Sequence, residues 1–180
     1  VLGKGSISGV SLKKFNTNNE LREKLRKKFN VIENQWVFMY LGRLKKDKGV
    51  IDLIEAFLKI KKEKNTVLFL VGDDEENLKK NHMSEPRIIF LPHNNKPENI
   101  IQICDTFCLP SYREGFGLSV IEASSLKKPI ISSNIYGLKD TVINKSTGLM
   151  FQAGDTEKLT ELLIYAINNK KKMKEMGSNG

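Results

Sequence analysis

The chain has 180 residues, of which 39% are hydrophobic and 28% charged, a balance that is ordinary for one globular domain with a sizeable core. It contains no run of 18 apolar residues, which excludes a membrane-spanning helix of the usual length. Thirty Lys and Arg against 21 Asp and Glu give a formal net charge of +9, so nucleic acid, anionic lipid headgroups and phosphorylated small molecules are all compatible ligands. The first residues form no signal peptide and include no initiator Met, so we expect a piece of a longer protein.

Helical patterns and apolar runs alternate along the chain. An extended segment that contains several glycines is expected first, over residues 1–18. Asn18 or Asn19 is expected to cap the helix that follows. Asp155 is expected to cap the last helix. Helices are predicted over 19–29, 50–60, 75–82, 97–103, from 118 onward and over 156–168, and strands over 36–41, 67–71, 87–91, 106–109, 129–132 and 148–151. The helix over 50–60 is expected to bury one face, formed by Ile51, Ile54, Phe57 and Leu58. The lysines after residue 168 are interpreted as a solvated face.

This alternation predicts a single α/β domain over residues 1–180, with a doubly wound parallel sheet and helices on both of its faces. In such a sheet ligands bind beyond the carboxyl ends of the strands. The loops that follow the strands at Gly42, Gly72, Leu91 and Glu114 should therefore converge on one crevice. Cys104 and Cys108, the only cysteines, lie among apolar residues and are expected to be buried free thiols, which suits a reducing, cytoplasmic compartment.

The segment from Glu114 to Glu122 joins a predicted strand to a predicted helix. Gly115 and Gly117 allow close approach of the backbone, and a helix N-terminus after a strand suits an anion. Helical spacing from Leu118 places Glu122 on the face that we expect to point inward. A carboxylate there needs a hydrogen-bond donor, such as the two hydroxyls of a ribose, although an ordinary surface glutamate remains an alternative.

Arg43 and Lys48 lie on one loop directly after a buried strand. Arg binds phosphate oxygens bidentately and Lys acts as a point charge, so the pair fits a diphosphate that leaves with growing negative charge. The alternative is ordinary surface charge. Asp73 and Asp74 are the only acidic pair after a strand and have no further ligand cluster, so we expect no metal and no cofactor.

Several other classes of site have weak support. No P-loop occurs, and Gly115 and Gly117 lack the third glycine of a dinucleotide fingerprint. His82 and His93 are the only histidines, and His93 is interpreted as a plain loop residue. The chain shows neither zinc-finger spacing nor a strand with base-stacking aromatics, so a basic nucleic-acid-binding module is kept as an alternative but not favoured.

Three segments together resemble the GT-B-fold glycosyltransferases of family 4. Residues 38–49 resemble that family's strand and basic "GRL…KG" loop, residues 114–122 resemble its E-x7-E signature, and residues 144–155 are similar to its last strand and helix cap. Residues 3–10 resemble a variant found in bacterial capsule and O-antigen transferases, with Ser11 where the family often has Asp. The resemblance covers essentially the whole chain.

The resemblance implies that the chain is the C-terminal, donor-binding half of a hexosyl or N-acetylhexosaminyl transferase. That transferase would retain the anomeric configuration and need no metal. Arg43 and Lys48 would hold the donor diphosphate, Glu114 would touch the transferred sugar, and Glu122 would accept from the ribose. The remaining donor contacts implied are Gly115, Phe116, Gly117, Leu118, Leu91 and Pro92, the last two at the base.

The resemblance also implies the partners. The donor would be a nucleotide sugar, with UDP expected on family grounds, and the acceptor a polyprenyl-diphosphate-linked saccharide of surface-polysaccharide assembly, bound through an absent N-terminal domain. The piece alone is expected to be inactive and cytoplasmic, and its basic surface is compatible with peripheral attachment to the anionic inner membrane. A nucleotide-sugar epimerase of the same fold is the second alternative.

Overall fold

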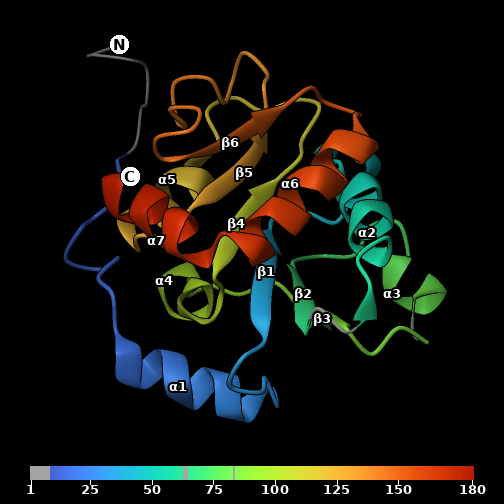
Figure 1. Cartoon of the computed structure of the whole chain (residues 1–180), viewed down its shortest axis with the longest axis horizontal. Coiled ribbons are helices and arrows are strands. Elements are labelled where there is room, and N and C mark those ends of the chain that lie inside the picture. Colours follow the sequence, from blue (N-terminus) through green and yellow to red (C-terminus); the bar gives the residue numbers. More distant parts are fainter. Residues whose placement is uncertain (1–8, 63–64, 83) are drawn as a thin grey trace.

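The computed structural model describes residues 9–62, 65–82 and 84–180. Its centre is a parallel sheet with the strand order β3-β2-β1-β4-β5-β6, and helices cover both faces (Figure 1). The strands are β1 Trp36–Leu41, β2 Thr66–Val71, β3 Ile88–Leu91, β4 Thr106–Leu109, β5 Ile130–Ser133 and β6 Gly148–Phe151. The doubly wound α/β fold predicted from the sequence is confirmed, whereas residues 3–8 of the motif expected over residues 3–10 lie outside the described residues.

The helices follow the predicted alternation with local differences. They are α1 Asn19–Lys28, α2 Val50–Leu58, α3 Leu78–Asn81, α4 Pro97–Ile100, α5 Leu118–Ser125, α6 Thr156–Asn168 and α7 Lys170–Asn179, with 3-10 turns η1 Lys46–Lys48 and η3 Ile101–Ile103. The helix expected over 75–82 is only one turn long, because Asp74 accepts hydrogen bonds from the amides of Leu78 and Lys79 and so starts α3 late. Among the described residues, no helix combines the length and apolarity needed to span a bilayer.

The core lies on the long neighbouring strands β1 and β2, which are buried along almost their whole length. Phe38 of β1 meets Phe57 of α2 edge to face, with ring centroids 6.3 Å apart. The face predicted for α2 was partly wrong, because Leu58 is 39% exposed and Ile51 only half-buried. The helix starts at Val50, and its buried residues are Val50, Leu53, Ile54, Ala56 and Phe57.

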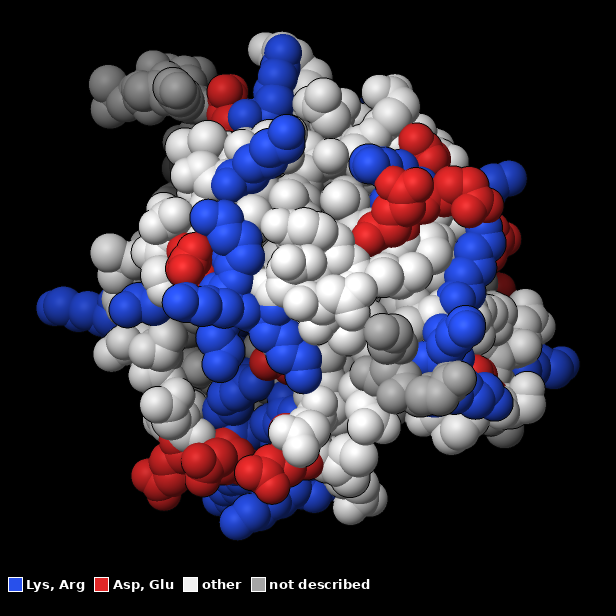
Figure 2. All heavy atoms as spheres, in the orientation of Figure 1, with Lys and Arg blue, Asp and Glu red and all other residues white. Residues whose placement is uncertain are grey.

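The lysine-rich C-terminal segment forms the last helix, α7, and is not merely a solvated tail. Met173, Met176 and Gly177 are buried, while the lysines around them project outward. Figure 2 shows Lys and Arg side chains gathered over this helix. The amphipathic pattern therefore separates an apolar contact face from a basic surface.

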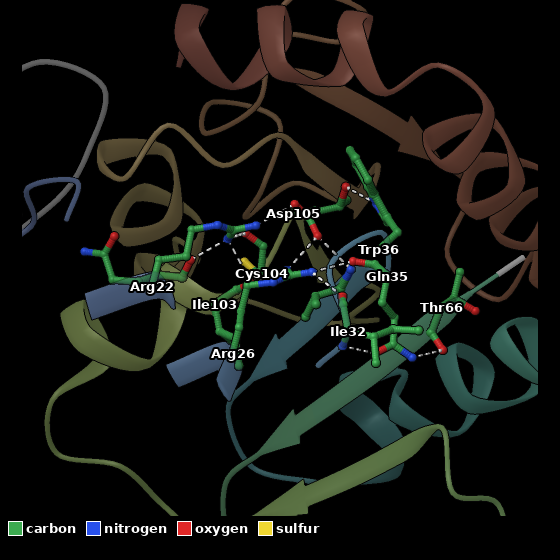
Figure 3. Close-up of polar contacts among 12 residues, drawn as sticks. Arg22, Arg26, Ile32, Gln35, Trp36, Thr66, Ile103, Cys104 and Asp105 are labelled. Atoms are coloured by element: carbon green, nitrogen blue, oxygen red, sulfur yellow. Dashed lines mark hydrogen bonds and ion pairs between the residues drawn. The ribbon is translucent and has the colours of Figure 1, made fainter. Parts of the chain in front are cut away.

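Arg22 ties α1 to the amino end of β4 (Figure 3). Its Nη2 lies 2.7 Å from Oδ1 of Asp105, the residue before that strand. Its Nη1 donates to the carbonyl oxygens at the end of η3, those of Gln102, Ile103 and Cys104. Oδ2 of Asp105 accepts from Arg26 at 3.3 Å and from the amide of Val37 at 2.8 Å. The cluster satisfies helix-end carbonyls that would otherwise lack donors.

Candidate functional site

The strand order reverses between β1 and β4, and the loops that leave these two strands touch each other. Gly49 has a φ of +64°, and a Cβ on it would lie 2.1 Å from the carbonyl oxygen of Pro110. The amide of Tyr112 donates to the carbonyl of Asp47 at 3.0 Å. The two loops therefore form one unit at the switch point, where open α/β sheets bind ligands.

Lys48 and Glu114 meet in this unit. Lys48 Nζ lies 2.9 Å from Glu114 Oε1 and 3.0 Å from the carbonyl oxygen of Arg113. Ser111 Oγ donates to the same Glu114 oxygen at 2.8 Å. Both charged side chains are mostly buried, with exposed fractions of 16% and 18%. The structure thus brings together two of the predicted catalytic residues, in an environment where a charge pair is only weakly screened.

Arg43 lies on the same loop as Lys48 but has a different partner. Its side chain is 58% exposed, and Nη1 lies 3.6 Å from Oε1 of Glu75 on the loop after β2. Its carbonyl oxygen accepts a hydrogen bond from the buried Tyr40 hydroxyl at 2.8 Å. The backbone of this loop is therefore fixed, while the guanidinium remains exposed to solvent.

The turn between β4 and α5 presents a helix N-terminus. Gly117 precedes α5 with a φ of +63°, and the helix has no side-chain N-cap. The first amides of an uncapped helix lack intrahelical acceptors and favour an anion. A Cβ on Gly115 would meet nothing within 4 Å, so there is open space on the side of Gly115 to which a side chain would project. Phe116 is half-buried and Leu118 is 42% exposed, which places both at the rim of the turn.

Glu122 is half-buried on the side of α5, and the inward face predicted from Leu118 was wrong. The residues of α5 that enter the core are Val120, Ala123 and Ser124, because the helix is rotated by about one position, roughly 100°, from the expected face. Partial burial raises the pKa of the Glu122 carboxyl, against the opposing effect of Lys14, and Glu98 raises it further. Partial burial therefore destabilises the charged form of Glu122, although the side chain does not enter the core.

Leu91 and Pro92 lie in a different part of the same sheet edge. Together with residues from the ends of β1 and β2 they line a cavity of about 400 Å³. Its other lining residues are Leu44, Gly72, Asp73, Asp74, Lys79 and Phe90. Lys48, Glu114 and Glu122 are not among the lining residues, so the predicted site residues do not all line one cavity.

The remaining candidates are one exposed histidine and two buried cysteines. His93 is exposed, and its Nε2 lies 2.9 Å from Oδ1 of Asn95. Cys104 and Cys108 are buried free thiols, as predicted. Burial raises the pKa of Cys104 to about 11 and that of Cys108 well above its usual value. Across the described ranges, His, Cys, Asp and Glu form no group of three that could hold a metal ion.

Several supporting residues could not be identified from the sequence. Tyr112 Oη donates to Oδ2 of Asp52 on α2 at 2.6 Å, and this bond raises the pKa of the phenol to about 12. Gly137, on the loop after β5, lies so close to the carbonyl of Glu114 that a Cβ on it would be 2.0 Å away. These contacts join residues from separate loops, and no local pattern signals them.

Three comparisons place the chain among known proteins. A family model described as "Glycosyl transferases group 1" matches residues 21–180. The chain is 34% identical to the capsular polysaccharide biosynthesis glycosyltransferase CapM of Staphylococcus aureus, covering 100% of this chain and 49% of that protein. It is 31% identical to the UDP-Gal:alpha-D-GlcNAc-diphosphoundecaprenol alpha-1,3-galactosyltransferase of Escherichia coli, covering 91% of this chain and 44% of that one.

Among solved structures, Anabaena HepE in complex with UDP-glucose matches with a TM-score of 0.87 at 25% identity. The match covers 95% of this chain and 49% of HepE. The chain therefore spans about half the length of the curated relatives it matches.

Proposed function

This chain belongs to the group 1 glycosyl transferases, and we propose that it is the half of such an enzyme that binds a nucleotide-diphosphate sugar. The observation that carries the proposal is the buried pair of Lys48 and Glu114, which lies at the sheet switch point beside the uncapped start of α5. Two similar proteins, a galactosyltransferase named for UDP-Gal and HepE with bound UDP-glucose, favour UDP as the nucleotide.

The donor diphosphate would lie between Lys48, Arg43 and the first amides of α5. These groups offer a point charge, a planar guanidinium and a helix N-terminus, all of which bind phosphate oxygens. Charge that grows on the distal phosphate as the sugar departs would be stabilised by the same groups, without a divalent metal. A bound phosphate would take the place of Glu75 beside Arg43, whereas Lys48 has a third N–H for the phosphate besides those bonded to Glu114 and Arg113.

Glu114 would orient the transferred sugar. Its bonds to Lys48 and Ser111 both go to Oε1, so Oε2 is the oxygen offered to a sugar hydroxyl. We assign it an orienting and electrostatic role in a transfer that retains the anomeric configuration. The open backbone at Gly115 gives the sugar room to approach.

Glu122 would accept from both ribose hydroxyls, which would offset the desolvation that raises its pKa. Leu91 and Pro92 would contact the base at the cavity beside them. In this arrangement α5 would bind the ribose, and the loop after β3 would bind the base.

The acceptor in this proposal is a lipid-linked saccharide of capsule or O-antigen synthesis. The capsule relative and the transferase named for an undecaprenol-diphosphate sugar support it. The acceptor would bind to the rest of the enzyme, on the cytoplasmic side of the inner membrane, and this half alone would be inactive.

Calorimetry with UDP, GDP and a short DNA at two salt concentrations tests the proposal. We expect saturable binding of UDP in preference to GDP, and only weak DNA binding that vanishes at high salt. Equal affinity for all three ligands, or strong salt-dependent DNA binding alone, would instead favour a nucleic-acid module.

A further inference from the structure

A second cavity lies at the opposite edge of the sheet from the proposed donor site. It has a volume of about 390 Å³, and Trp36, Asp105 and Pro129, which begin or precede β1, β4 and β5, contribute to its wall. Because the strands are parallel, these residues mark their amino ends. Strands of four to six residues separate the two edges by about 13–20 Å, at roughly 3.3 Å per residue.

The wall of this cavity carries an excess of positive charge. Arg22, Lys127, Lys128 and Lys174 face a single acidic residue, Asp105. Both oxygens of Asp105 are occupied, one by Arg22 and the other by Arg26 and the amide of Val37. Within the described part of the chain, the three lysines of the wall have no ion pair with a carboxylate.

Lys128 is half-buried, whereas Lys127 and Lys174 are exposed. The Nζ of Lys128 donates to the carbonyl oxygens of Gln102 at 3.0 Å and Cys104 at 2.9 Å. An ammonium has three donors, so one remains for a ligand. Burial lowers the pKa of Lys128, which is the direction expected for a cation with incomplete charge compensation. An anion in the cavity would supply that compensation.

Close packing holds the rim of the cavity in place. Lys127 has a φ of +56°, a conformation that lysine seldom adopts. Its carbonyl oxygen lies against Gly177 of α7, where a Cβ would be only 2.2 Å away. This contact brings α7, with Lys174 one turn earlier, onto the turn that carries Lys127 and Lys128. Lys170 lies over the ring of Trp36, 5.6 Å from its centroid, and adds further positive charge at this edge.

We propose that this cavity is a second anion site, which binds a phosphate group independently of the donor nucleotide. The volume lies within the 300–1,000 Å³ typical of small-ligand pockets, so a phosphate and part of its attached group fit. Three lysines without carboxylate partners suit a phosphate group, whose oxygens can accept from several ammonium donors at once. Both inorganic phosphates and the headgroup of an anionic lipid offer this chemistry.

The test is calorimetry of inorganic pyrophosphate with this chain saturated with UDP, so that the donor site is occupied. The variant carries Lys127→Asn, which tolerates the left-handed conformation, and Lys174→Ala. We expect its affinity for pyrophosphate to fall at least tenfold. The matched control, Lys61→Ala with Lys62→Ala, removes two exposed lysines that do not line the cavity and should bind as the parent does. Circular dichroism of both variants checks the fold.

Equal affinity in the variant and the parent would overturn the proposal. So would amide NMR shifts on pyrophosphate addition that are confined to residues 43–48 and leave residues 126–129 and 174–178 unmoved. Co-sedimentation with phosphatidylglycerol vesicles then identifies the source of the phosphate. If the parent binds the vesicles and the same variant does not, the ligand of the cavity is a lipid headgroup. If the variant binds the vesicles as the parent does, the ligand is a free phosphate compound.

Discussion

Lys48 Nζ and Glu114 Oε1 lie 2.9 Å apart although 66 positions separate the two residues in the sequence. One follows β1 and the other follows β4, and these neighbouring strands end at the same sheet edge. Neither loop could place its charge alone, because Gly49 must fit against the carbonyl of Pro110 for the side chains to meet. The pair links the fold directly to the proposed chemistry.

Replacing Lys48 with alanine in the full-length enzyme should lower turnover. Loss of one positioned donor for developing charge typically reduces kcat about 10²–10³-fold. The matched control is Lys46→Ala, which removes an exposed lysine from the same turn. Steady-state kinetics with a UDP-sugar measures both variants, and an equal kcat for them would contradict the role of Lys48.

Glu122→Ala should weaken binding of UDP to this chain. Hydrogen bonds to a charged group contribute about 1.5–3 kcal/mol, so we expect a loss of roughly 10–100-fold in affinity. Glu161→Ala, on the exposed surface of α6, serves as the control. Calorimetry that gives the same dissociation constant for both variants would exclude the ribose contact.

The affinity for UDP should also fall in mild acid. Burial raises the pKa of Glu122, so its carboxylate protonates at a higher pH than an ordinary glutamate, and a protonated carboxyl accepts less well from the ribose. The same shift destabilises the fold above the raised pKa, where the group is charged, and this penalty is relieved as the pH falls through it. Titrations from neutral pH downward should show the loss of affinity in the parent and a flatter profile in Glu122→Gln.

The glycines of the two loops should respond differently to alanine. Gly49→Ala places a Cβ 2.1 Å from Pro110 O at a φ of +64°, and such strained conformations cost about 1–3 kcal/mol even without the clash. Gly115→Ala meets no atom within 4 Å and should fold normally. Chemical denaturation compares the two, and a Gly49→Ala variant as stable as Gly115→Ala would refute the close contact.

Tyr112→Phe should loosen the loop that carries Glu114. The variant loses the hydrogen bond to Asp52, which is worth about 1 kcal/mol. Tyr136→Phe is the control, because Tyr136 is 86% exposed. Urea denaturation measures the stabilities, and identical midpoints would show that the Asp52 bond contributes nothing.

Periodicity and end signals were enough to predict most elements. The bounds of β1, β4, β6 and α6 follow from apolar runs and the Asp155 cap, whose side chain accepts from the amide of Lys158. Local chemistry decides these elements, because strand burial and helix capping depend on residues close in the sequence. The parallel sheet and the edge at which the loops gather follow from the alternation of strands and helices, whereas the strand order is known only from the structure.

Contacts between distant segments were decided only by the tertiary structure. The sequence placed Arg43 and Lys48 on one loop, but packing turned Lys48 toward Glu114 and Arg43 toward Glu75. Packing also rotated α5 from the expected orientation, so that Glu122 is half-buried beside the core instead of inside it. The cation cluster around Lys128 arises in the same way, from α1, α7 and the turn before β5. Sequence periodicity fixes which residues share a helix face, whereas the orientation of that face depends on the neighbours it packs against.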